Sequence, residues 1–191
     1  MKTWISVIFF ILVFMTKSAH SQTDGARELN YSYLGPVLSA AYNKVEYTDW
    51  FGTSTETKKI SGYILAGGLT FNIFADEFCG DLQIKYAYNN LETAISYIEI
   101  SAAGKYFFYR MNDSISLGGG FGMYLEIPTP SENQNGSAGL QLPFTMLINT
   151  SRTTKLFIDV YCRYGTFGTG TDTNSISVGT NIGFIFQVGR I

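Results

Sequence analysis

The strongest constraint on the fold is a regular alternation of side chains near the C-terminal end of the chain. Between Ser175 and Val188, apolar residues fill nearly all of one set of alternate positions and small or polar residues fill the other, and Ile185 departs from the pattern. A repeat of two residues is the period of a β-strand, whose successive side chains point to opposite faces. The pattern therefore predicts a strand with an apolar environment on one side and a polar environment on the other.

Related alternation recurs along the chain, and together the segments predict eight strands. Each is long enough to cross a bilayer at a steep tilt, and their number is even, as in single-chain bacterial barrels. Pro36 is expected to mark a bulge or an irregular edge. The predicted strands are at about 30–47, 62–73, 79–89, 93–108, 114–127, 140–149, 155–164 and 175–188.

The connections between these strands alternate in length. Short connections are predicted at 75–78, 110–113 and 150–153, and longer ones at 48–59, 128–137 and 167–173, with a brief one at 89–92 on the same side as the long ones. Short turns on one side and long loops on the other are typical of outer-membrane barrels, with the short turns in the periplasm. Because hydrocarbon offers no partner to an open sheet edge, the sheet must close. We therefore predict an all-β fold, an eight-stranded antiparallel up-and-down transmembrane β-barrel over residues 22–191.

The first 21 residues are predicted to be a cleaved signal peptide. Lys2 precedes an apolar run from Trp4 to Met15, and Ala19 and Ser21 provide the small-x-small spacing for cleavage after Ser21. The run is too short to span a bilayer as a helix, although an uncleaved anchor is the alternative. No cysteine follows the run, so lipoprotein processing is not expected. The rest of the chain is rich in Tyr, Phe and Gly and has no helix-length apolar stretch, which favours β-structure.

The polar positions of the predicted strands carry charges that would face the lumen. An eight-stranded barrel is barely wide enough for its own side chains, and buried charges must be paired. We therefore predict a hydrogen-bonded ion network that fills the lumen, with Asp159 opposite Asn181 and Arg163 opposite Ser177. A narrow or gated path for small solutes is the alternative. The predicted network comprises Asp81, Lys85, Glu99, Lys105, Glu126, Asp159 and Arg163.

Aromatic residues gather near the predicted strand ends, where amphipathic rings favour the lipid headgroup boundary. Core packing in a soluble sandwich is the alternative interpretation. The predicted outer rim contains Tyr47, Trp50, Phe51, Tyr88, Tyr164 and Phe167, and the predicted inner rim contains Phe74, Phe78, Tyr106, Phe107, Phe108, Tyr109, Phe184 and Phe186. The two cysteines, Cys79 and Cys162, fall on strands on opposite sides of the barrel, and we expect two isolated thiols.

No catalytic, cofactor or metal site is predicted. The single histidine, His20, lies in the predicted signal peptide, so the mature chain lacks the usual general base and the commonest transition-metal ligand. The glycine-rich run at 117–122 lacks the Lys-Ser/Thr and the helix of a phosphate loop. A net charge of −2 gives no footprint for nucleic-acid binding.

The strand map and the last strand resemble the small outer-membrane β-barrel superfamily, of the OmpX/Ail type and the OmpA transmembrane-domain type. The segment from Asn181 to Val188 resembles the signal read by the barrel-assembly machinery, and Asn181, Gly183, Phe186 and Val188 match its positions. Members usually end on an aromatic residue, whereas this sequence reads Gly189-Arg190-Ile191. No peptidoglycan-binding domain follows, unlike in full-length OmpA-like proteins. The resemblance implies an integral bacterial outer-membrane protein, contact with outer-membrane lipid, passage through the assembly machinery, and a monomer.

We expect a non-enzymatic structural or surface-interaction role, in envelope integrity or adhesion, with specificity in the loops. The partner bound by the loops is unknown. The polar residues of these loops include Asp49, Glu56, Lys58, Lys59, Glu132, Asn133, Gln134 and Asn135. The alternatives are a narrow pore or an OmpW-like transporter of small solutes, a lipid-modifying enzyme, which the missing histidine disfavours, and a soluble lipocalin-like barrel, which requires the apolar face to point inward.

Overall fold

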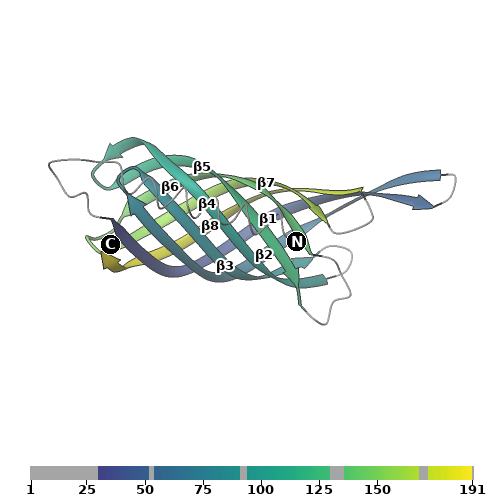
Figure 1. The fold of residues 1–191 in the computed structure, drawn as a ribbon, viewed down its shortest axis with the longest axis horizontal. Helices are drawn as coiled ribbons and strands as arrows, with labels where there is room; N and C mark the ends of the chain where they lie inside the picture. Colours follow the sequence, from purple (N-terminus) through teal and green to yellow (C-terminus); the bar gives the residue numbers. More distant parts are fainter. Residues whose placement is uncertain (1–29, 52–53, 91–93, 130–135, 168–171, 191) are drawn as a thin grey trace, which may run out of the picture.

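The computed structural model describes residues 30–51, 54–90, 94–129, 136–167 and 172–190, and these form eight strands in a closed barrel (Figure 1). The predicted signal peptide lies outside the described residues. Within the described ranges, no helix is long and apolar enough to cross a membrane. The strands are β1 (Tyr31–Phe51), β2 (Ser54–Ala75), β3 (Phe78–Asn90), β4 (Ala94–Asn112), β5 (Ile115–Pro128), β6 (Ser137–Asn149), β7 (Thr154–Phe167) and β8 (Asp172–Arg190).

Every strand pairs antiparallel with its neighbours in the sequence, and β1 pairs with β8 to close the ring. The predicted all-β, eight-stranded up-and-down topology is therefore confirmed. The predicted register between β7 and β8 is also confirmed, with Asp159 opposite Asn181 and Arg163 opposite Ser177.

The ring closes with a stagger that makes the barrel narrow and its strands tilted. A path that starts at Val37 and follows directly opposite partners around the ring returns to β1 at Tyr47, ten residues farther along the strand. Stagger and strand number together set the diameter, and eight strands leave a lumen that side chains can fill. The path passes through Gly68, Lys85, Glu99, Glu126, Ser137, Phe167 and Thr173.

The apolar face of the alternating pattern points outward. Leu38 is 70% exposed, whereas its neighbour Val37 is 1% exposed, and β8 repeats the contrast with Ile182 at 47% and Asn181 at 4%. A soluble barrel would bury its apolar face and expose its polar one. The lipocalin-like alternative is therefore wrong, and the exposed apolar belt is suited to hydrocarbon.

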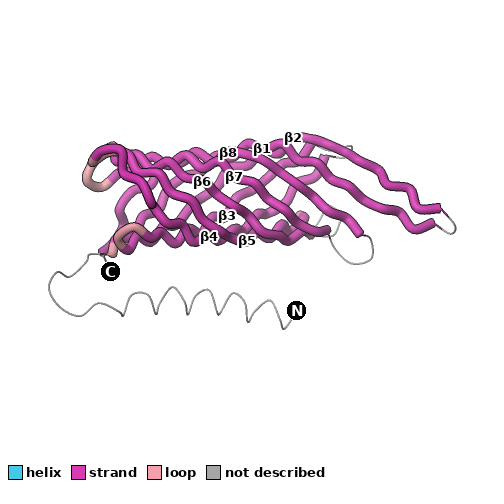
Figure 2. The backbone as a smooth tube through the Cα atoms, turned by 90° about the horizontal axis from the view of Figure 1, so that it is seen from above, coloured by secondary structure: helices cyan, strands magenta, loops and turns pink. Residues whose placement is uncertain are grey.

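The two ends of the barrel differ, and we name them by their connections. The turn end carries the connections at 76–77, 113–114 and 150–153, together with the start of β1 and the end of β8 (Figure 2). The loop end carries the other four connections. Two short turns match the sequence prediction, but β4 continues to Asn112, where its Oδ1 accepts hydrogen bonds from the backbone N–H groups of Ser114 and Ile115, both at 2.9 Å. The turn between β4 and β5 is thus shorter than the predicted connection at 110–113.

The predicted long loop at 48–59 is wrong, because β1 and β2 continue through it as a hairpin. The two strands stay paired out to Phe51 opposite Ser54. β8 leaves β1 at Thr48, and β3 joins β2 only at Tyr63, so the hairpin projects beyond the ring (Figure 1). Apart from Trp50 and Phe51, residues 48–59 are polar, charged or glycine, so the apolar alternation used to find strands has no counterpart there.

The first strand is irregular, but the register shift is not at Pro36. The ladder between β1 and β8 shifts between Ser32 and Tyr33, and it has no matched pair at Gly35 or Pro36. A Cβ at Gly35 would collide with the backbone carbonyl oxygen of Phe184, so the close approach of β8 requires glycine here.

We expect Leu38→Arg to destabilise the barrel in a lipid bilayer by about 2–4 kcal/mol, because the side chain would enter the hydrocarbon. Ser61→Arg provides the matched control, since Ser61 is exposed on the projecting part of β2 and the effect there should be about 0–1 kcal/mol. Urea unfolding in lipid vesicles measures both variants. Equal losses at the two positions would contradict an apolar belt that faces lipid.

Candidate functional site

The lumen contains two clusters of buried ions stacked along the barrel axis. We call Asp81, Lys105 and Asp159 the lower ion cluster and Lys85, Glu99 and Arg163 the upper ion cluster; the lower one lies closer to the turn end. All six residues are no more than 5% exposed. The structure therefore brings together six of the seven charged residues that the sequence placed in the lumen.

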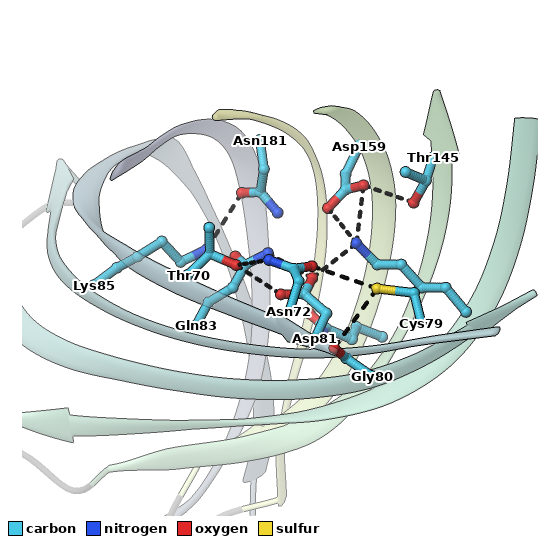
Figure 3. A network of polar contacts seen from close by, with 12 residues as sticks. Thr70, Asn72, Cys79, Gly80, Asp81, Gln83, Lys85, Thr145, Asp159 and Asn181 are labelled. Carbon is cyan, nitrogen blue, oxygen red and sulfur yellow. Dashed lines mark hydrogen bonds and ion pairs between the residues drawn. The ribbon is translucent and has the colours of Figure 1, made fainter. Parts of the chain in front are cut away.

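In the lower ion cluster, one ammonium group lies between two carboxylates. Lys105 Nζ lies 2.7 Å from Asp81 Oδ2 and 2.9 Å from Asp159 Oδ2 (Figure 3). Thr70 and Gln83 donate hydrogen bonds to Asp81, each at 2.8 Å, and Thr145 donates to Asp159 at 2.6 Å. These hydroxyl and amide donors satisfy carboxylate oxygens that a single lysine leaves open, as burial of charge requires.

In the upper ion cluster, one carboxylate is shared by two cations. Arg163 binds Glu99 through two nitrogens, at 2.6 and 2.8 Å, and Lys85 Nζ lies 2.7 Å from Glu99 Oε1. The guanidinium group also lies over the rings of Tyr161 and Tyr124, with its Cζ 4.3 and 4.8 Å from their centroids. The bidentate geometry and the two rings fix the guanidinium group in one orientation.

Glu126 stands apart from both clusters. It lies directly opposite Glu99 in the β4–β5 ladder, but Lys85 and Arg163 both pair with Glu99. In the described ranges Glu126 makes no ion pair, and its neighbours include the hydroxyl groups of Ser137 and Tyr97. Glu126 therefore lies on the lumen side of its strand, as predicted, but among the described residues it has no cation partner and does not join the ion pairs of the network.

Below the lower ion cluster, toward the turn end, an apolar plug fills the lumen. We define the plug as Tyr33, Val37, Leu147, Phe157 and Ile185, which are buried together. Ile185, the residue that interrupts the alternation of the last strand, is 0% exposed. Its apolar side chain faces inward because its neighbours there are plug residues and not ions.

Two aromatic residues predicted for the inner rim lie inside the barrel instead. Phe74 and Phe107 pack against the plug, with their ring centroids 6.1 Å apart. Both residues lie at alternate positions whose side chains point into the lumen. The prediction considered only their nearness to a strand end and not the face on which they lie. Phe78, Tyr106, Phe108, Tyr109, Phe184 and Phe186 are exposed on the outer face, as are Tyr88 and Tyr164 near the loop end. The side chains of Tyr47, Trp50, Phe51 and Phe167 lie outside the described part of the structure.

The two cysteines occupy opposite faces of the barrel wall. Cys79 is buried beside the lower ion cluster, where its thiol donates to Asn72 Oδ1 at 3.5 Å, and Cys162 is exposed on the outer face. Both are free thiols. Among the described residues, no group of three or more His, Cys, Asp or Glu side chains is placed to hold a metal ion.

The residues of the predicted assembly signal divide between the two faces of β8. Asn181 is buried and accepts a hydrogen bond from Lys85 Nζ at 3.2 Å, and Gly183 is buried beside the Phe157 ring. Phe186 and Val188 are exposed on the outer face. Recognition of these residues by the assembly machinery stays a prediction.

Solved structures with a similar fold are surface and outer-membrane proteins. Neisserial surface protein A matches at a TM-score of 0.50 and 12% identity, over 78% of this chain and 95% of that chain. The chain has the fold of a small eight-stranded outer-membrane β-barrel. OprG from Pseudomonas aeruginosa matches at 0.47 and 13% identity over 81% and 96%, and Ail of Yersinia pestis at 0.42 and 14% over 82% and 99%. The sequence matches no protein-family model and no curated protein.

We expect Lys105→Met to destabilise the barrel by about 3–5 kcal/mol, because it leaves two buried carboxylates without their cation. Heat-shifted mobility on gels and urea unfolding measure the loss. The triple variant with Asp81→Asn and Asp159→Asn is the matched control and should regain most of the stability. A loss that is small, or that the triple variant does not reverse, would indicate a hydrated lumen instead.

Proposed function

We propose that the protein is a non-enzymatic integral outer-membrane barrel that presents a surface for interaction at its loop end. The observation that carries this proposal is the hairpin of β1 and β2, which projects beyond the ring of eight strands (Figures 1 and 2). Residues 54–62 of β2 pair with β1 on one side and precede the first pair with β3, Tyr63 opposite Asn90.

An exposed strand edge is a surface for binding another extended chain. Its unpaired backbone N–H and C=O groups accept an added strand, which is how β-augmentation gives affinity. Proteins that keep such an edge free of random association often place lysine on it. Lys58 and Lys59 lie on this edge, and Lys59 Nζ lies 3.3 Å from Glu46 Oε1 on the paired strand. The backbone of this edge could thus accept an added strand, and its lysines would disfavour strands that carry positive charge.

The filled lumen supports the assignment of function to the surface and not to transport. Two ion clusters and an apolar plug lie one above another, and their side chains are almost wholly buried. A solute that crossed the barrel would have to displace buried ion pairs, which leaves charges without partners at a cost of about 3–5 kcal/mol for each pair broken.

A narrow pore is the second candidate function, and one feature of the loop end favours it. Asn43 Oδ1 and Asn89 Oδ1 are buried and have no hydrogen-bond partner within the described ranges. Buried polar atoms of this kind are usually satisfied by water, so this part of the lumen is suited to ordered water molecules.

Shortening the hairpin tests the interaction proposal. Replacement of residues 47–58 by Asn-Gly joins Glu46 to its ladder partner Lys59 through a two-residue turn. The variant loses only the last two pairs of β1 with β8, so the ring of strands stays closed. We expect cells that express this variant to lose attachment to surfaces coated with matrix or serum proteins, relative to cells that express the intact protein. Heat-shifted mobility verifies folding, and resistance to detergent should stay unchanged.

Equal attachment by both strains, at a level above that of cells without the protein, would contradict a role for the hairpin. Loss of detergent resistance with unchanged attachment would point to envelope integrity as the main role.

A further inference from the structure

A cavity of about 770 Å³ opens at the turn end of the barrel, opposite the hairpin. Its rim comes from the turns at 76–77 and 150–153 and from both ends of the strand array, including Tyr31 and Arg190, which are ladder partners. Its floor is the apolar plug, where Tyr33 and Leu147 line the cavity beside Phe74 and Phe107. The cavity therefore ends at the plug and does not continue through the barrel.

The charges around this cavity favour an anion. Arg110, Arg152, Lys155 and Arg190 line it, against two acids at the rim, Asp76 and Glu77. In the described part of the chain these four cations form no ion pair with a carboxylate. Among the described lining residues, cations thus outnumber acids by two, and an excess of positive charge in a concave site concentrates anions.

Lys155 places one of these cations deep in the cavity. It is half-buried near the start of β7, and its Nζ lies 5.4 Å from the centroid of the Tyr33 ring and 5.7 Å from that of Phe74. It donates one hydrogen bond, to Asn149 Oδ1 at 2.5 Å. An ammonium group has three donors, so it retains the capacity to bind an incoming oxyanion.

We propose that this cavity binds a small carboxylate that has a flat apolar body. The carboxylate would lie between Lys155 and an arginine of the rim, and the body would lie on Phe74, Phe107 and Leu147. Charge-assisted hydrogen bonds to the carboxylate would contribute to the affinity, and burial of the apolar body would add a second contribution. Inorganic phosphate would satisfy the charge but leave the apolar floor exposed to water. The volume lies in the range of small-ligand sites. The site is independent of the hairpin and goes beyond the proposed function.

Isothermal titration of the folded protein in lipid nanodiscs tests the proposal, with 2-naphthoate as the probe and empty nanodiscs as the blank. We expect saturable binding at one site. The neutral analogue 2-naphthalenemethanol should bind about tenfold more weakly or worse, because it lacks the charge, and phosphate should bind more weakly still. N-acetyl-Gly-Phe, which ends in an apolar residue with a free carboxylate, separates the two sources of this chemistry: tighter binding than naphthoate assigns the site to peptide termini, and weaker binding to free acids.

Two variants locate the binding. Lys155→Met should weaken naphthoate binding about tenfold or more, and Arg152→Gln, in an exposed turn that tolerates substitution, should weaken it in the same direction. Lys44→Met is the matched control, since Lys44 is an exposed lysine near the loop end that pairs with Glu46, and its loss should leave binding unchanged. Heat-shifted mobility verifies that each variant is folded.

No saturable heat beyond that of empty nanodiscs would overturn the proposal. So would unchanged affinity in both Lys155→Met and Arg152→Gln, or binding of phosphate as tight as that of naphthoate. Because the hairpin lies at the other end of the barrel, shortening it should not affect these titrations, so failure of this proposal is distinguishable from failure of the interaction role.

Discussion

A β-sheet surrounded by hydrocarbon cannot leave a strand edge unpaired, because each buried N–H or C=O group without a partner costs several kcal/mol. The hydrogen-bonded ladder between β1 and β8 meets this requirement, and its ten-residue stagger sets the width of the barrel. The outward face then has to be apolar and the narrow lumen has to be filled. The apolar belt, the ion clusters and the plug are all consequences of this closure.

The buried charges in the lumen are compensated because single ions pair with two partners of opposite charge. Glu99 serves two cations and Lys105 serves two carboxylates, and threonine, glutamine and asparagine side chains complete the remaining hydrogen bonds. Shared ion pairs of this kind hold their members in one arrangement, whereas removal of one partner leaves an uncompensated charge. The interior is therefore suited to stability, and the features that remain open to other molecules lie at the two ends.

Much of this fold could be predicted from the sequence because alternation is a local property. The last strand fixes which residues share a face, and β7 and β8 follow each other in the chain, so Arg163 opposite Ser177 followed from counting residues outward from their connection. The sequence did not show which charged residues would form ion pairs with one another. Glu99 meets Arg163 across the lumen from β4 to β7, and that contact depends on the stagger and the diameter of the ring, which no local pattern encodes.

The hairpin and the apolar plug were missed because their residues do not follow the simple alternation of apolar and polar positions. The continuation of β1 and β2 past Tyr47 carries no apolar alternation, so the sequence pattern gave no signal for it. Ile185 and Phe107 are apolar residues on the polar parity because they close the turn end of the lumen. Parity together with position along the strand would have found the plug, since apolar residues at inward positions near the turn end are its signal.

Single-channel conductance of the folded protein in a planar bilayer tests most directly the claim that the lumen is filled and that function lies at the ends. A barrel that is folded by heat-shifted gel mobility should give no reproducible discrete current steps under an applied voltage. Reproducible steps of uniform size would contradict the filled lumen and would make transport of small solutes the better account of this protein.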